Sequence, residues 1–145
     1  MRTQRLPVFL ALALAAVLGL LVAPDAQASP HCSESDLQGS YAGNFGGTIT
    51  GVGPVAAQIL AIYNGDGTAT GVKTTLMSGT GGPTTFTSTV TYTLNADCTG
   101  TLTVVRSTGQ TTHYVIVVTG KNAEEIHILA TDPGSVVTGV SKAVR

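Results

Sequence analysis

Arg106, His113 and Tyr114 are the side chains of this sequence best suited to chemistry, and they lie close together in its second half. A guanidinium can bind the carboxylate of a ligand or pair with an acid of the protein. Its head can also reach water beyond an apolar stem. A histidine with a neighbouring tyrosine could anchor a ligand or act as a general acid. We therefore take Arg106 and His113 as candidate binding residues and assign no catalytic residue.

The sequence contains no familiar motif of a catalytic, metal or cofactor site. The nucleophile-elbow sequence GxSxG is absent, and the glycine-rich stretches are not followed by a helix that could help to bind phosphate. Glu124 and Glu125 are adjacent and would diverge on a strand, which disfavours a carboxylate pair. Asn64 and Asp66 resemble the start of a calcium loop, but its later ligands are missing. We expect no cofactor and no metal.

Cys32 and Cys98 are the two cysteines of the chain, and an exported pair most simply forms a disulfide. The loop between them is long enough for the chain-entropy model to predict a stabilisation of about 4 kcal/mol. Two free thiols or an intermolecular bond are the alternatives. Two cysteines and three scattered histidines do not have the spacing of a zinc site.

Residues 1–28 have the features of a secretory signal peptide. Two early arginines precede an apolar run over residues 8–23, and Ala26-Gln27-Ala28 has the small-x-small form that signal peptidase accepts. A single membrane anchor is the alternative, although the apolar run is near the lower limit for a span. We predict a secreted or periplasmic protein with a leader at 29–38 that carries Cys32 and one domain at 39–145.

The charge of the chain after residue 28 argues against two classes of partner. Five basic and seven acidic residues give a net charge of −2 with the histidines neutral. Nucleic-acid binding needs a basic field, and binding to anionic lipid needs a polybasic stretch. We therefore expect no nucleic acid and, after cleavage of the signal, no membrane as a partner.

Residues 84–94, TTFTSTVTYTL, alternate threonine with other residues, which is typical of a half-buried strand. Links rich in turn residues separate similar segments, and these links are too short for the crossover of a parallel pair. The pattern predicts an all-β fold, an eight-stranded antiparallel up-and-down barrel, with a two-sheet β-sandwich as the alternative. The expected strands are residues 39–50, 54–63, 68–77, 84–94, 99–107, 111–119, 125–131 and 136–144.

One internal repeat supports this meander. Residues 63–70 and 94–101 both read apolar, Asn, x, Asp, x, Thr, x, Thr, which predicts two hairpins built on one kind of turn. In an eight-strand meander, the amino terminus and the turn after the fourth strand lie at the same end. Cys32 and Cys98 should therefore meet at that end, with the leader lying across it.

The hairpin of residues 84–107 has a preferred register. Its two apolar faces coincide if Tyr92 lies opposite Leu102, Val90 opposite Val104 and Ser88 opposite Arg106. In this register, the residues that we predict to form the wall of a ligand site point inward, and Arg106 lies near one mouth of the barrel. The wall residues are Phe86, Val90, Tyr92, Leu102 and Val104.

The following hairpin leaves two alternatives. A two-residue turn at Thr108 and Gly109 would place His113 inside the barrel, whereas a turn that differs by one residue would place Tyr114 there. The segments 54–63 and 68–77 are apolar or small on both faces. This pattern predicts contact beyond the barrel core, as in a homo-oligomer that forms through these strands.

An eight-stranded barrel is either filled by its own side chains or able to hold one small ligand. The small residues of the strands favour room for a ligand, and a packed interior is the alternative. Our leading hypothesis is a protein that binds a small hydrophobic ligand in its lumen. A cofactor-free cyclase or isomerase in the same lumen, and a structural or protein-interaction module of the cell envelope, are the alternatives.

Several segments resemble those of small secreted bacterial β-barrel proteins. They are Gly39-Ser40-Tyr41, NGDGTATG, DCTGTLTV and the closing EIHILATDPGSVVTGV. In architecture the chain is similar to the calycins and to barrels of the allene-oxide-cyclase and dirigent type. The resemblance implies a lumen that binds a hydrophobic or flexible small molecule and sometimes guides its cyclisation without a cofactor. It transfers no catalytic position to this chain.

Overall fold

The computed structural model describes residues 31–79 and 81–145, so the predicted signal peptide lies outside the described residues. Every predicted strand is present, with ends within a few residues of the expected ones. The elements are the short 3-10 helix η1 (Glu34–Asp36) and the strands β1 (Gln38–Ile49), β2 (Gly53–Asn64), β3 (Thr68–Ser78), β4 (Gly81–Leu94), β5 (Thr99–Arg106), β6 (Thr111–Thr119), β7 (Glu125–Ala130) and β8 (Ser135–Ala143).

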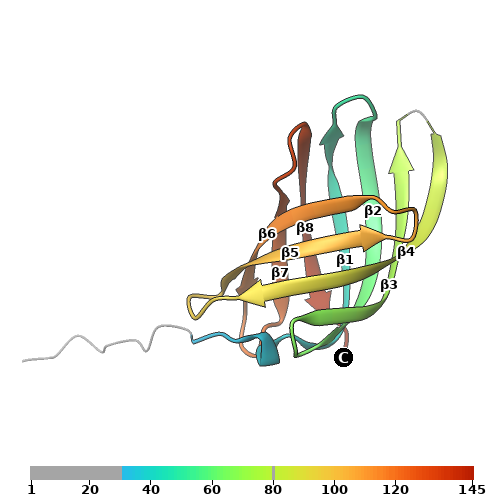
Figure 1. Ribbon diagram of the computed structural model, residues 1–145. Coiled ribbons are helices and arrows are strands. Elements are labelled where there is room, and N and C mark those ends of the chain that lie inside the picture. The colour runs from blue at the N-terminus through green and yellow to red at the C-terminus, as the bar shows by residue number, and fades with distance from the viewer. Residues whose placement is uncertain (1–30, 80) are drawn as a thin grey trace, which may run out of the picture.

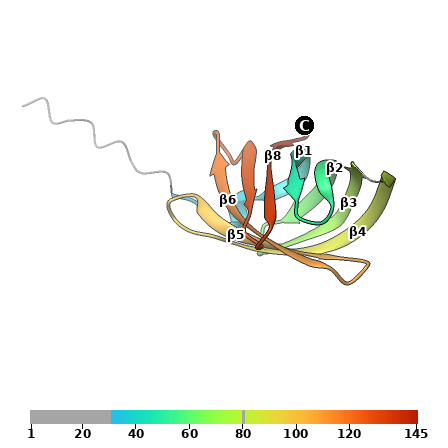
Figure 2. The ribbon, with the colours of Figure 1, turned by 90° about the horizontal axis from the view of Figure 1, so that it is seen from above.

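The eight strands form a closed antiparallel barrel in chain order (Figures 1 and 2). Closure comes from the pairing of β1 with β8, which runs from Tyr41 opposite Ala143 to Ile49 opposite Ser135. Because every strand then has two partners, no edge is left unpaired. The predicted up-and-down barrel is confirmed, and the two-sheet sandwich is excluded.

The predicted register of the β4–β5 hairpin is also confirmed. Tyr92 lies opposite Leu102, Val90 opposite Val104, and Ser88 opposite Arg106. The odd-numbered threonines of the two strands face outward, where the hydroxyls of Thr93 and Thr101 lie 2.9 Å apart. The alternation of residue types therefore determines which face of this hairpin enters the barrel.

The turn between β5 and β6 follows the second alternative. The Arg106 N–H donates to the carbonyl of Gln110 at 2.8 Å, so three residues form the loop, and Gly109 takes a positive φ of 86° within it. Leu102 consequently lies opposite Tyr114, whose side chain faces inward. The placement of His113 inside the barrel is wrong, because this loop is one residue longer than a two-residue turn.

The two repeated turns have the same hydrogen bonds, as their shared sequence predicts. Oδ1 of Asp66 accepts bonds from the backbone N–H and the hydroxyl of Thr68, at 3.0 and 2.6 Å. Oδ1 of Asp97 accepts the corresponding two hydrogen bonds from Thr99 at the same distances. These bonds to the ionised form, first from the threonine hydroxyl, lower the pKa of both aspartates.

The described part of the leader, residues 31–38, closes one end of the barrel, at the bottom of Figure 1. Cys32 and Cys98 form the predicted disulfide, with their Cα atoms 5.0 Å apart. The Cys32 N–H also donates to the carbonyl of Ala96 at 3.1 Å. Leu37, at the end of the leader, is fully buried in the core. The leader is thus an integral part of the packed structure.

Three tyrosines fill the interior next to this closed end. The rings of Tyr41 and Tyr63 meet edge to face with centroids 5.2 Å apart, and those of Tyr63 and Tyr92 do so at 5.3 Å. The Tyr41 hydroxyl donates to the carbonyl of Ala123 at 2.7 Å. Burial raises the pKa of the Tyr63 hydroxyl far above its usual range, so this group is neutral. The closed end is therefore a packed core.

Candidate ligand-binding cavity

A cavity of about 420 Å³ occupies the barrel on the other side of these tyrosines. Its volume lies within the range of small-molecule sites, roughly 300–1,000 Å³. Tyr63 contributes to its inner lining, and the exposed residues Gln110 and Thr111 line it near the turn between β5 and β6. The cavity is therefore enclosed by strands and reaches the end of the barrel opposite the disulfide.

Most of the lining is apolar and comes from all parts of the barrel wall. Alternate residues of β2 face it, as the period of two requires, and further apolar groups come from β1, β3, β7 and β8. These residues are Val55, Ala57, Ile59 and Ala61 of β2, with Phe45, Leu76, Ala130 and Val137. Several of them are small, which is the physical reason that the interior is not filled.

Five of the seven residues predicted to bind a ligand line this cavity. They are Phe86, Val90, Leu102, Val104 and Arg106. Tyr92 does not line it, because its ring is buried in the tyrosine cluster at the closed end. His113 does not line it either, because its side chain lies on the outer face of β6 and is 55% exposed.

His113 instead bonds to Asp132, which follows β7. Its backbone N–H donates to Oδ2 of Asp132 at 2.8 Å, and its ring Nδ1 lies 2.8 Å from Oδ1. These contacts, the one with the ring first, lower the pKa of Asp132. Asp132 is also part of the cavity lining, so His113 contacts a lining residue without lining the cavity itself.

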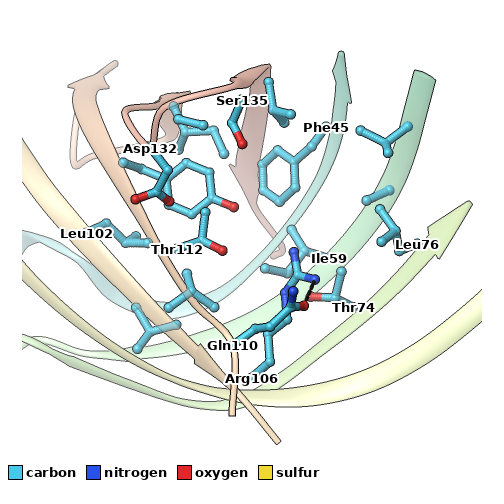
Figure 3. A pocket seen from close by; sticks show the side chains of 18 of the residues that line it. Phe45, Ile59, Thr74, Leu76, Leu102, Arg106, Gln110, Thr112, Asp132 and Ser135 are labelled. Carbon is cyan, nitrogen blue, oxygen red and sulfur yellow. Dashed lines mark hydrogen bonds between the residues drawn. The ribbon is translucent and has the colours of Figure 1, made fainter. Parts of the chain in front are cut away.

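Arg106 is held by two contacts at the edge of the cavity. Its guanidinium carbon lies 4.6 Å from the centroid of the Phe86 ring, and Nη1 donates to Oε1 of Gln110 at 3.0 Å. In Figure 3 the guanidinium points into the cavity together with the Gln110 amide. In the part of the chain that the structure describes, no carboxylate forms a salt bridge with Arg106. The guanidinium is therefore positioned without a counter-ion.

Tyr114 and Thr112 also line the cavity. Tyr114 is the inward-facing residue in one of the two turn alternatives that the sequence allows. Burial raises the pKa of the Tyr114 hydroxyl, and the charge of nearby Arg106 opposes this effect. The hydroxyl is therefore neutral at physiological pH and able to donate a hydrogen bond. Arg106, Gln110, Thr112 and Tyr114 provide a set of polar donors on one side of an otherwise apolar space.

Sequence reasoning missed the lining residues of β1, β2, β3, β7 and β8. The signal in β2 was ambiguous, because its outer residues Leu60 and Ile62 are as apolar as its inner ones. These two side chains are 47% and 43% exposed, and Met77 of β3 is 48% exposed. The apolar outer surface expected on these strands is present, and self-association through it stays a prediction.

Neither a metal cluster nor a membrane helix is found in the described ranges. Within residues 31–79 and 81–145, no three His, Cys, Asp or Glu residues gather in a way that could hold a metal ion. No helix in those same ranges is long and apolar enough to span a membrane.

The comparisons with known proteins add no relative. No protein-family model matches the chain, and neither a curated protein nor a solved structure matches it. The cavity itself therefore has to support any functional conclusion.

Proposed function

We propose that this protein binds one small, largely apolar molecule in the lumen of its barrel. The observation that carries the proposal is the cavity of about 420 Å³, which has mostly apolar walls and extends to the turn between β5 and β6. Protein interiors are otherwise packed like organic crystals, so a void of this size loses contacts that a ligand would restore. An apolar ligand is the occupant that these walls favour.

The two ends of the barrel support this proposal in different ways. The disulfide, the leader and the three tyrosines make the closed end a packed structure. Stability can come from this end, so the small residues around the cavity need not fill it. Such a division between a packed end and a hollow end suits a binding protein with a preformed site.

The compartment and the architecture are consistent with the same proposal. A disulfide between Cys32 and Cys98 is compatible with an extracellular or periplasmic protein, and we place the mature chain there. The resemblance to calycins and to dirigent-type barrels supports the lumen as the place of binding. Because a fold does not determine a function, the cavity carries more weight than this resemblance.

A direct test is native mass spectrometry of the protein purified from its own host, which should detect a small apolar molecule that is released on unfolding. A second test is titration with the neutral fluorescent dye Nile red. Ala57→Leu adds volume to the cavity wall, whereas Ala56→Leu adds the same volume to the exposed outer face of β2. We expect Ala57→Leu to weaken dye binding several-fold and Ala56→Leu to leave it unchanged. Equal binding by both variants would contradict the proposal.

One observation favours a cofactor-free cyclase or isomerase as a second candidate. Such an enzyme needs polar groups that converge on the ligand, and Arg106 and Tyr114 line the same cavity. Once a bound molecule is identified, Arg106→Gln and Tyr114→Phe should each lower its turnover. If the protein leaves the molecule chemically unchanged, binding alone is the function.

A further inference from the structure

We propose that the ligand is an amphipathic monoanion whose carboxylate lies against Arg106 near the mouth, with its apolar body in the lumen. This inference rests on the proposed function and names the class of molecule that the site would take. It depends on the charge, the position and the free hydrogen-bond donors of Arg106.

Arg106 places a positive charge at the cavity without a counter-ion among the described residues. Among the described residues, it is the only lysine or arginine that lines the cavity, and no carboxylate there forms a salt bridge with it. Lys142 and Arg145 pair with Glu125 and Glu124, and the remaining lysines of the described residues, Lys73 and Lys121, are exposed to solvent. A half-buried charge beside apolar walls is unfavourable without a counter-ion, and an anionic ligand would supply one.

The geometry of Arg106 also favours a ligand with a carboxylate. The Phe86 ring lies against the guanidinium, and the Gln110 side chain accepts a hydrogen bond from one guanidinium N–H group. A guanidinium has five N–H donors in a planar fork, so donors remain that could bind a carboxylate through two parallel bonds. Because Phe86 and Gln110 already restrict the side chain, little conformational entropy is lost on binding.

The one acid in the lining does not neutralise this site. Asp132 lines the cavity, but its Oδ2 accepts the His113 N–H and its Oδ1 lies 2.8 Å from the His113 ring. Both of its carboxylate oxygens thus contact His113 on the outer face of β6, and Asp132 forms no salt bridge with Arg106. Tyr114, with a neutral hydroxyl that lies near Arg106, could donate a further bond to the ligand's carboxylate.

The test compares two molecules that differ only in the head group. Decanoate and decan-1-ol are unbranched and have ten carbons each, and each is titrated at pH 7 against the disulfide-bonded protein loaded with Nile red. We expect decanoate to displace the dye at about tenfold lower concentration than decan-1-ol, since a bond to a charged partner contributes about 1.5 kcal/mol or more. Arg106→Gln should raise the Kd of decanoate about tenfold and leave that of decan-1-ol unchanged.

Two matched variants control this experiment. Lys73→Gln removes a positive charge from the outer face of β3 and should change neither affinity. Tyr63→Phe removes the hydroxyl at the inner end of the cavity and should leave the preference for decanoate intact. Unchanged binding of decan-1-ol by Arg106→Gln also shows that this variant is folded.

The outcomes separate this inference from the proposed function. If Nile red binds but decanoate displaces it no better than decan-1-ol, the carboxylate assignment is wrong while the lumen remains a binding site. If the preference for decanoate is lost in Tyr63→Phe and kept in Arg106→Gln, the head group lies at the closed end and the inference is overturned. If neither Nile red nor the two molecules enter the lumen, the proposed function itself fails.

Discussion

The Tyr92 hydroxyl, on β4, donates a hydrogen bond to the main-chain carbonyl of Leu37, the residue just before β1. The hydroxyl lies 3.2 Å from the carbonyl oxygen of Leu37, which follows η1, and 3.0 Å from that of Glu34, the first residue of η1. The Leu94 N–H adds a bond to the Glu34 carboxylate at 3.2 Å. Tyr92 therefore holds the leader in place and does not contact the cavity.

Tyr92→Phe should destabilise the protein without weakening ligand binding. Loss of the hydroxyl leaves two carbonyls without this donor, and we expect the free energy of unfolding to fall by about 1–2 kcal/mol. Urea unfolding measures this change, and Nile red titration should give an unchanged Kd. Tyr114→Phe is the matched control, because its hydroxyl belongs to the cavity lining. A Tyr92→Phe protein with normal stability but weakened binding would show that Tyr92 belongs to the site.

Removal of the disulfide should cost about 4 kcal/mol, by the chain-entropy model for a loop of this length. Cys98 also has a positive φ of 67°, where its counterpart in the repeated turn is Gly67 with a φ of 84°. Because glycine adopts this conformation more easily than serine, Cys32→Ser with Cys98→Gly should be about 1 kcal/mol more stable than Cys32→Ser with Cys98→Ser. Thermal and urea unfolding compare the two double variants. A glycine variant that is the less stable of the two would contradict this account of the turn.

Gly139 permits the contact between β1 and β8 that closes the barrel. A Cβ atom at this position would overlap the Phe45 ring and the carbonyl oxygen of Asn44. We expect Gly139→Ala to lower the free energy of unfolding by about 1–3 kcal/mol, as overpacking does elsewhere. Gly46→Ala is the control on β1, because its Cβ would meet only the Val55 carbonyl oxygen at 3.7 Å. Equal stability of the two variants in urea would contradict a close contact at this seam.

The two turn aspartates should make the stability depend on pH in the acid range. The pKa of Asp66 and of Asp97 is lower in the folded protein, chiefly because of the threonine hydroxyls. A lowered folded pKa gives stability that is present above the unfolded value of about 3.9 and is lost as the pH falls toward the folded value. Urea unfolding should therefore show little change from pH 7 to about pH 5 and a decline below about pH 4.

Asp66→Asn with Asp97→Asn tests the origin of this decline. The double variant is expected to lose less stability than the native protein between pH 5 and pH 3, whatever its stability at pH 7. Glu34, Glu125 and Asp132 also have lowered pKa values and contribute to the remaining slope, through backbone hydrogen bonds, Lys142 and His113 respectively. An identical slope in the double variant would exclude the turns as the cause.

The parts of the fold that follow from local patterns could be predicted from the sequence. Threonine alternates with apolar residues in β4, so the inner face and the register with β5 follow from residue types alone. The repeated Asn-x-Asp-x-Thr turns follow from their local sequence, and the meeting of Cys32 with Cys98 follows from the order of the strands. The alternation in β4 and its register with β5 also predict that Phe86, Val90 and Arg106 face the interior, where the cavity lies.

Two parts of the site depend on features that the alternation of residue types does not determine. In β6, a loop that is one residue longer than a two-residue turn reverses the two faces, which brings Tyr114 inward and His113 outward. In β2, both faces are apolar, so only the pairing with β1 and β3 shows that Ala57 and Ile59 face the interior. Neither loop length nor pairing can be read from the alternation of one strand.

By itself, the sequence determined the strands, their order and the end at which the sulfur atoms meet, because these features depend on neighbouring residues and short links. Only the tertiary structure decided that the tyrosines fill one end and that a cavity remains at the other. The physical reason is that packing sums the volumes of side chains from eight strands at once. The absence of a salt bridge to Arg106 within the described residues is likewise a result of that arrangement, since it depends on which carboxylates the barrel brings near the guanidinium.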